Sequence, residues 1–155
     1  MASFSVREVV EMAIQTERLG YAFYEEMAGR FPDHKGLKDL FTTLAKKEHH
    51  HEQVFTDLLG KIKDAPALEG WEEAQPYFRA MVESEFFLGD KKALPSMDRV
   101  GTVAEAADFA LGFEKETLLF FVGLRQGVRE KDVVEDIIEE EMSHIVWLKE
   151  FKESL

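Results

Sequence analysis

The 155-residue chain contains no cysteine. This absence excludes disulfides, thiolate zinc sites, iron–sulfur clusters and thiol catalysis, so any bound metal must be held by oxygen and nitrogen atoms. The chain also lacks an 18-residue apolar run of the kind that crosses a bilayer. Its first ten residues lack the basic and apolar stretches of a secretory signal. We therefore expect a cytoplasmic protein with no membrane partner.

Basic residues are few in comparison with acidic ones. Lysine and arginine number 19 against 31 aspartates and glutamates, which gives a formal net charge of −12. Binding to phosphate backbones requires clustered basic side chains, so nucleic acid is not an expected partner. The apolar fraction of 45% is sufficient for a hydrophobic core, and the length suits one domain over 1–155.

Proline and glycine are sparse, with 4 and 10 residues, and helical periodicity dominates between them. The pattern predicts long helices over about 5–30, 33–62, 102–127 and 130–154. Capping-box patterns open two of them, at Ser5 and at Thr102. The remaining stretch, about 63–101, is a long crossover with a shorter amphipathic helix from Trp71 to Leu88. The fold class is therefore all-α, a four-helix bundle with a long crossover.

The two halves of the chain repeat one pattern. The segment from Ala13 to Glu17 aligns with Ala110 to Glu114, and Glu48-His49-His50-His51 aligns with Glu141-Met142-Ser143-His144. One pair of helices is thus used twice.

Six ionisable residues fall on the apolar stripes of these helices: Glu17, Glu48, His51, Glu114, Glu141 and His144. Buried carboxylates without compensation are costly and repel one another. Two divalent cations would balance four carboxylates and two neutral imidazoles. Each Glu-x-x-His pair spans one helical turn, so its two side chains can hold the same ion. A single such pair is expected by chance, and the prediction rests on the ordered set in both halves.

These residues, with the neighbouring Phe23-Tyr24 and Phe120-Phe121, make the chain resemble the rubrerythrin-like branch of the ferritin-like superfamily. The resemblance covers the four long helices and implies a ferritin-like bundle with a non-haem site for two iron ions, although manganese or zinc also suits these ligands. By this likeness Glu48 and Glu141 bridge the ions. Glu17 and His51 complete the coordination of one ion, and Glu114 and His144 complete that of the other.

Tyr24 matches a tyrosine that lies beside the metals in such proteins. It is the candidate catalytic residue outside the ligand set, through a hydrogen bond from its hydroxyl to a ligand carboxylate. The alternative is a core aromatic. Glu140 is expected on a solvated face, with a hydrogen bond to a ligand histidine as the alternative, and His49 and His50 are expected at the surface.

The chain also departs from full-length rubrerythrins. These carry a four-cysteine rubredoxin iron site, which this chain lacks. They also carry an additional glutamate one turn before the third-helix ligand, where this chain has Leu111.

Three functions remain open. The first is a di-iron peroxidase or oxidase of oxidative stress, which reduces hydrogen peroxide or dioxygen with electrons from a separate donor such as a rubredoxin-type protein. The second is a ferroxidase that stores or delivers iron. The third is a metal-binding helical bundle without catalysis. A homodimer or larger homo-oligomer is expected.

Overall fold

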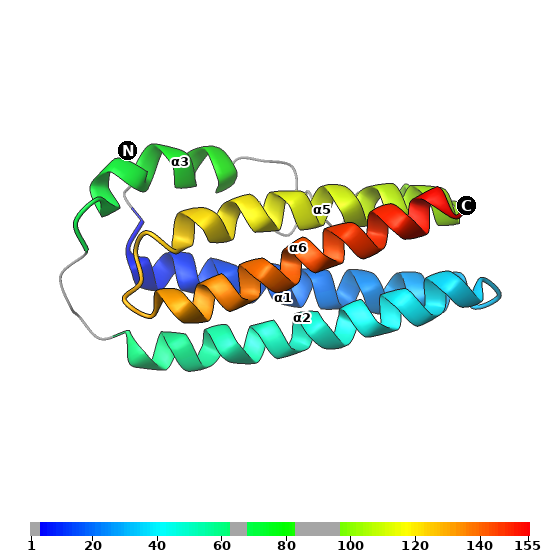
Figure 1. Ribbon diagram of the computed structural model, residues 1–155, viewed down its shortest axis with the longest axis horizontal. Coiled ribbons are helices and arrows are strands. Elements are labelled where there is room, and N and C mark those ends of the chain that lie inside the picture. The colour runs from blue at the N-terminus through cyan, green and yellow to red at the C-terminus, as the bar shows by residue number, and fades with distance from the viewer. Residues whose placement is uncertain (1–3, 63–67, 83–96) are drawn as a thin grey trace.

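The computed structural model describes residues 4–62, 68–82 and 97–155. Within these ranges the regular elements are helices, as predicted (Figure 1). They are α1 (Val6–Arg30), α2 (Lys35–Lys61), α3 (Trp71–Val82), α5 (Val103–Leu124) and α6 (Lys131–Glu153). In the described part of the chain, no helix is long and apolar enough to cross a membrane.

The helix starts follow local capping chemistry. The Ser5 hydroxyl accepts a 3.1 Å hydrogen bond from the Glu8 amide, and the Thr102 hydroxyl accepts one of 3.1 Å from the Glu105 amide. Both predicted capping positions are confirmed. The second helix starts slightly later than its predicted position near residue 33, because His34 is its N-cap and accepts from the Leu37 amide.

The four long helices form two antiparallel pairs. Helix α1 packs along α2, and α5 packs along α6 (Figure 1). The sequence repeat therefore corresponds to a repeat of structure, in which one helical hairpin faces the other. The long crossover between α2 and α5 connects the two hairpins.

Helix α3, in this crossover, covers one end of the bundle beside α5 (Figure 1). Its Trp71 and Phe78 are buried, and the Trp71 indole donates a 3.0 Å hydrogen bond to the Phe4 carbonyl. The Trp71 ring packs against Gly127, where a larger residue would not fit, since a Cβ there would lie 2.1 Å from the ring. The helix predicted from Trp71 to Leu88 is described as far as Val82, and the rest of that prediction falls on residues 83–96, which lie outside the described part.

Two apolar clusters fill the bundle, one on each side of its middle. One cluster contains the first part of α1, the last part of α2 and of α5, and the first part of α6. The other contains the complementary part of each helix. Between them, each long helix contributes at least one buried glutamate from near its centre. These glutamates are enclosed by apolar side chains along the bundle axis.

Candidate metal centre

Every residue of the predicted ligand set lies at this middle level and is fully buried. The set comes from all four long helices, and its members are Glu17 on α1, Glu48 and His51 on α2, Glu114 on α5, and Glu141 and His144 on α6. Since helical spacing alone does not fix how four helices rotate about their axes, this convergence is a property of the tertiary structure.

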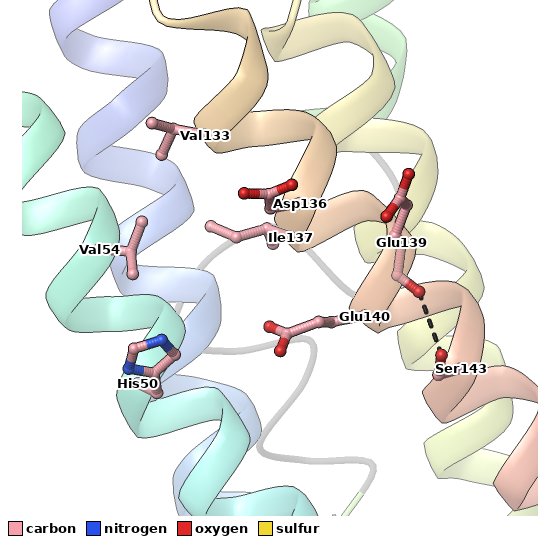
Figure 2. A pocket seen from close by; sticks show the side chains of 8 residues that line it. All are labelled: His50, Val54, Val133, Asp136, Ile137, Glu139, Glu140 and Ser143. Carbon is pink, nitrogen blue, oxygen red and sulfur yellow. Dashed lines mark hydrogen bonds between the residues drawn. The ribbon is translucent and has the colours of Figure 1, made fainter.

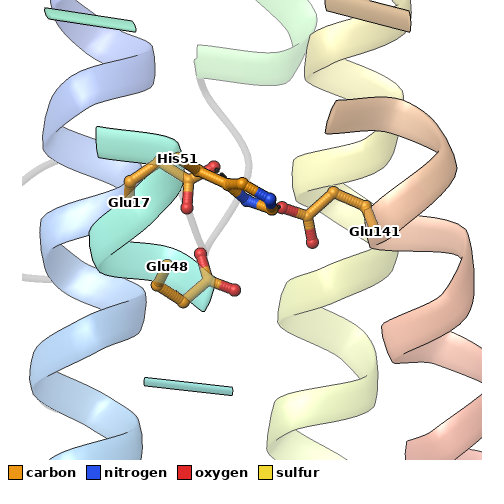
Figure 3. Close-up of side chains that lie close together, drawn as sticks. All are labelled: Glu17, Glu48, His51 and Glu141. Atoms are coloured by element: carbon orange, nitrogen blue, oxygen red, sulfur yellow. Dashed lines mark ion pairs between the residues drawn. The ribbon is translucent and has the colours of Figure 1, made fainter. Parts of the chain in front are cut away.

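The six side chains form two overlapping groups of possible metal ligands. The first group is Glu17, Glu48, His51 and Glu141, and the second is Glu48, Glu114, Glu141 and His144. In each group the four ligand atoms lie within 4.8 Å of one another. Figure 3 shows the first group, with side chains from α1 and α2 facing Glu141 of α6. Glu48 and Glu141 belong to both groups.

Both imidazoles present Nδ1 to the carboxylates. Nδ1 of His51 lies 2.9 Å from Glu141 Oε1, and Nδ1 of His144 lies 3.2 Å from Glu141 Oε2. The two rings are nearly parallel, with centroids 5.8 Å apart. The members of each Glu-x-x-His pair also belong to one ligand group, so the carboxylate and the ring nitrogen lie on the same side of their helix.

Several oxygens of this cluster have no hydrogen-bond partner among the described residues. They include both carboxylate oxygens of Glu17, both of Glu48 and one each of Glu114 and Glu141. An unsatisfied buried acceptor is unfavourable by about 1–3 kcal/mol, and more if it is charged. Oxygen and imidazole nitrogen are also the donors that first-row divalent ions accept. The free acceptors and the donor set both fit a pair of such ions.

Burial shifts the carboxyl groups toward protonation. It raises the pKa of Glu17 and, more strongly, that of Glu48, whose neighbouring carboxylates add to the effect. Burial and the charge of Glu141 raise the pKa of Glu114 to about 8. Without a cation the cluster must therefore retain protons, and a bound cation would compete with them.

The pKa values of the two histidines are also raised, whereas that of Glu141 is lowered. Burial alone would lower the pKa of both imidazoles, but the closely spaced carboxylates of Glu141, Glu17 and Glu114 outweigh it and raise the pKa of His51 to about 11 and that of His144 to about 9. Burial would raise the pKa of Glu141, but its close contacts with Glu114 and the two histidines hold it well below its usual value. The metal-free cluster thus stores its protons on the histidines and on the other glutamates.

Tyr24 lies against the cluster, which agrees with the first of the two interpretations considered for it. Its side chain is fully buried, and its hydroxyl donates a 2.6 Å hydrogen bond to Glu114 Oε1. Burial and the Glu114 charge raise its pKa well above the ordinary value, so the phenol stays protonated and remains a donor.

Glu140 contacts a ligand histidine, which was the alternative considered for it. Its Oε2 lies 2.5 Å from Nε2 of His51, and its Oε1 lies 3.6 Å from Lys47 Nζ. His49 and His50 are exposed, as expected. The expectation of a purely solvated Glu140 was wrong, because it depended on how α6 is rotated toward α2. A carboxylate at Nε2 holds the proton there and leaves Nδ1 free to bind a metal.

A pocket of about 630 Å³ opens between α2 and α6 beside the cluster (Figure 2). It is lined by His50, Val54, Val133, Asp136, Ile137, Glu139, Glu140 and Ser143. Glu140 therefore lines the pocket and also contacts His51 of the buried cluster.

Two residues near the ligands were not predicted from the sequence. A Cβ on Gly20 would lie 3.1 Å from Glu48 Oε2, so this glycine makes room for the carboxylate. Its position inside a long helix could have indicated this role, because glycine is unfavourable there unless another group approaches the backbone closely. Thr117, one turn after Glu114, is the other, and its buried hydroxyl has no partner among the described residues.

Comparison with solved structures identifies the class of fold. A protein from Thermotoga maritima, described as a ferritin-like diiron-carboxylate protein, is similar in structure with a TM-score of 0.73 and 21% sequence identity. The similarity covers 99% of this chain and 97% of that one, so the fold is ferritin-like. The Rubrerythrin family model matches residues 8–152, and the chain therefore belongs to the rubrerythrin family. No curated protein matches the chain.

Proposed function

We propose that this protein is a di-iron carboxylate oxidoreductase that reduces hydrogen peroxide or dioxygen. The observation that carries the proposal is the pair of overlapping ligand groups, which share Glu48 and Glu141 in a fully buried cluster. Membership of the rubrerythrin family supports it, as does the description of the structurally similar protein as a diiron-carboxylate protein.

The proposed ligand assignment follows from which residues are shared. Glu48 and Glu141 each offer two oxygens and belong to both groups, so they would bridge the two ions. Glu17 and His51 would complete one ion, and Glu114 and His144 the other. Four carboxylates and two neutral imidazoles balance two divalent cations, which removes the electrostatic penalty of burying the cluster.

When bound, two ferrous ions supply the two electrons that convert one hydrogen peroxide and two protons into two water molecules. The protein's own groups set the conditions for this reaction. The apolar clusters on either side exclude bulk water from the site. Tyr24 holds Glu114 in place through its hydroxyl, and Glu140 fixes the ring orientation of His51.

Entry of the oxidant and supply of electrons require routes through the protein surface. The pocket between α2 and α6 brings solvent to Glu140, one hydrogen bond from His51. A small oxidant such as hydrogen peroxide fits this approach. The chain has no cysteine and hence no cysteine-ligated iron to relay electrons. A separate redox protein of the rubredoxin type would therefore supply them.

Anaerobic loading with Fe(II), followed by stopped-flow mixing with peroxide or dioxygen, tests the proposal. We expect two Fe(II) ions per chain and oxidation faster than that of free Fe(II), with the faster oxidant identifying the substrate. Reduction of the oxidised protein by a rubredoxin-type donor should restore the reactive state. Failure to bind two Fe(II) ions, or oxidation no faster than in buffer, would overturn the proposal. Uptake of many iron ions per chain would instead indicate storage.

A further inference from the structure

We infer that the two metal positions of the cluster are unequal, and that the position between Glu17 and His51 binds a divalent ion first and more tightly. The inference rests on the proposed dinuclear site. Its basis is a comparison of the two hairpins, whose ligands repeat but whose surrounding residues do not. We call the ligand group with Glu17 and His51 the Glu17 position, and that with Glu114 and His144 the Glu114 position.

The histidines differ in what contacts the nitrogen that faces away from the site. His51 Nε2 lies 2.5 Å from Glu140 Oε2, whereas the buried His144 Nε2 has no hydrogen-bond partner among the described residues. The repeat explains the difference. Glu140 directly precedes the ligand Glu141, and the residue that directly precedes Glu48 is Lys47. An ammonium group has no lone pair to accept a proton from His144.

A carboxylate that accepts the proton of a ligand histidine makes the ring a stronger ligand and fixes its orientation. It also adds negative charge close to the Glu17 position. Lys47 Nζ, 3.6 Å from Glu140 Oε1, partly offsets that charge but leaves Oε2 bonded to His51. At the Glu114 position, no carboxylate of the described residues accepts a hydrogen bond from Nε2 of His144. This difference favours a cation at the Glu17 position.

The two glutamates that each belong to only one ligand group, Glu17 and Glu114, differ as well. The Tyr24 hydroxyl donates to Glu114 Oε1 at 2.6 Å, but the repeat places Phe121, which has no hydroxyl, where Tyr24 would have its counterpart. Neither oxygen of Glu17 has a hydrogen-bond partner in the part of the chain that the structure describes. The donated hydrogen bond orients Glu114 but occupies a lone pair and withdraws charge from it. The charge withdrawn from Glu114 weakens the Glu114 position, and the Glu140 contact strengthens the Glu17 position, so both differences favour metal binding at the Glu17 position first.

The expected size of the difference follows from residues that contact metal ligands in other sites. Removal of such a residue lowers metal affinity by about 10–100-fold. We therefore expect the two positions of the wild-type protein to differ by at least about tenfold in dissociation constant. The first equivalent of metal should then occupy mainly the Glu17 position.

Titration of the metal-free protein with Co(II) under anaerobic conditions, followed by its visible absorption, measures the two steps. A crystal grown with one equivalent of Co(II) locates the first ion by anomalous scattering. We expect two separable binding steps and higher occupancy between Glu17 and His51 than between Glu114 and His144.

Variants identify the cause of the asymmetry. Glu140→Gln should weaken the first step by about 10–100-fold and bring it close to the second. Glu139→Gln is the matched control, because Glu139 is exposed on the same helix and its carboxylate has no contact with His51 in the structure. It should leave both steps unchanged. The exchange variant Lys47→Glu/Glu140→Lys moves the carboxylate toward His144 and should shift the first ion to the Glu114 position.

The results separate this inference from the proposed function. Equal occupancy of the two positions in the wild type, or equal weakening of both steps by Glu140→Gln, would overturn the inference and leave the dinuclear site intact. Failure of the wild type to bind two Co(II) ions would remove the proposed function itself. If the exchange variant does not fold, as measured by circular dichroism, the comparison of Glu140→Gln with Glu139→Gln decides the question.

Discussion

The hydroxyl of Tyr24 on α1 donates a 2.6 Å hydrogen bond to Glu114 on α5, across the interior of the bundle. Both side chains are fully buried, so this bond connects the two helical hairpins at the level of the candidate metal centre. It satisfies one Glu114 oxygen and leaves the other, Oε2, without a hydrogen-bond partner among the described residues. One end of the carboxylate is thereby held while the other is free for a metal ion.

Tyr24→Phe should destabilise the metal-free protein by about 1–2 kcal/mol, because Glu114 Oε1 loses its buried donor. Urea unfolding of the metal-free variant measures this change. Tyr21→Phe is a suitable control, since Tyr21 lies on the same helix with 39% of its surface exposed. An unchanged midpoint in Tyr24→Phe would show that the hydrogen bond contributes nothing to stability.

Glu48→Ala should abolish binding of both metal ions, because Glu48 is shared by the two ligand groups. Metal analysis of protein purified after iron loading measures the stoichiometry. Glu25→Ala removes an exposed carboxylate from the neighbouring helix and should retain the wild-type metal content. Two ions per chain in the Glu48 variant would contradict its place as a shared ligand.

The metal-free protein should lose stability as pH rises. Burial raises the pKa of Glu114 from 4.5 to about 8. Burial by itself would lower the pKa of His144, but its contacts with Glu114 and Glu141 outweigh burial and raise that pKa from 6.5 to about 9. Each group binds more protons in the folded state, so its stabilising effect is complete below the unfolded pKa and disappears as pH passes the folded value. For these two groups the decrease extends from about pH 4.5 to about pH 9.

Urea unfolding at intervals between pH 5 and pH 9, on protein prepared with a chelator, measures this dependence. Metal binding should give the opposite trend, because ions compete with the same protons and bind better as pH rises. The difference in melting temperature between metal-loaded and metal-free protein should therefore widen toward pH 9. At 100 times the dissociation constant the bound metal stabilises the fold by about 2.7 kcal/mol. Metal-free stability that increases steadily from pH 5 to pH 9 would contradict the assignment of protons to this cluster.

Gly20→Ala should weaken metal binding while the helix itself tolerates alanine. The added Cβ would lie 3.0 Å from Phe113 Cε1 and 3.1 Å from Glu48 Oε2, so the ring and the carboxylate must both shift by a few tenths of an ångström. We expect a decrease in Co(II) affinity of roughly tenfold. Gly29→Ala, in the same helix with no atom within 4 Å of the new Cβ, should stabilise the protein by up to about 1 kcal/mol and leave metal affinity unchanged. Equal Co(II) affinity in the two variants would show that Gly20 does not make room for the ligand.

Local interactions explain why much of this protein was predictable. The capping residues Ser5 and Thr102 act on amides three residues away, and helical periodicity is visible within one segment of sequence. The two Glu-x-x-His pairs span one turn each, so their members share a helix face whatever the rest of the chain does. The repeat of the two halves then indicated a symmetric pair of hairpins and a single level for the ligands.

The helices, their apolar stripes and the six residues that lie on them are therefore encoded locally along the chain. The contacts across the bundle are not: Glu140 with His51, Tyr24 with Glu114, and Gly20 with Glu48. Such contacts depend on the rotation and axial register of one helix against another, and packing of the whole core sets both.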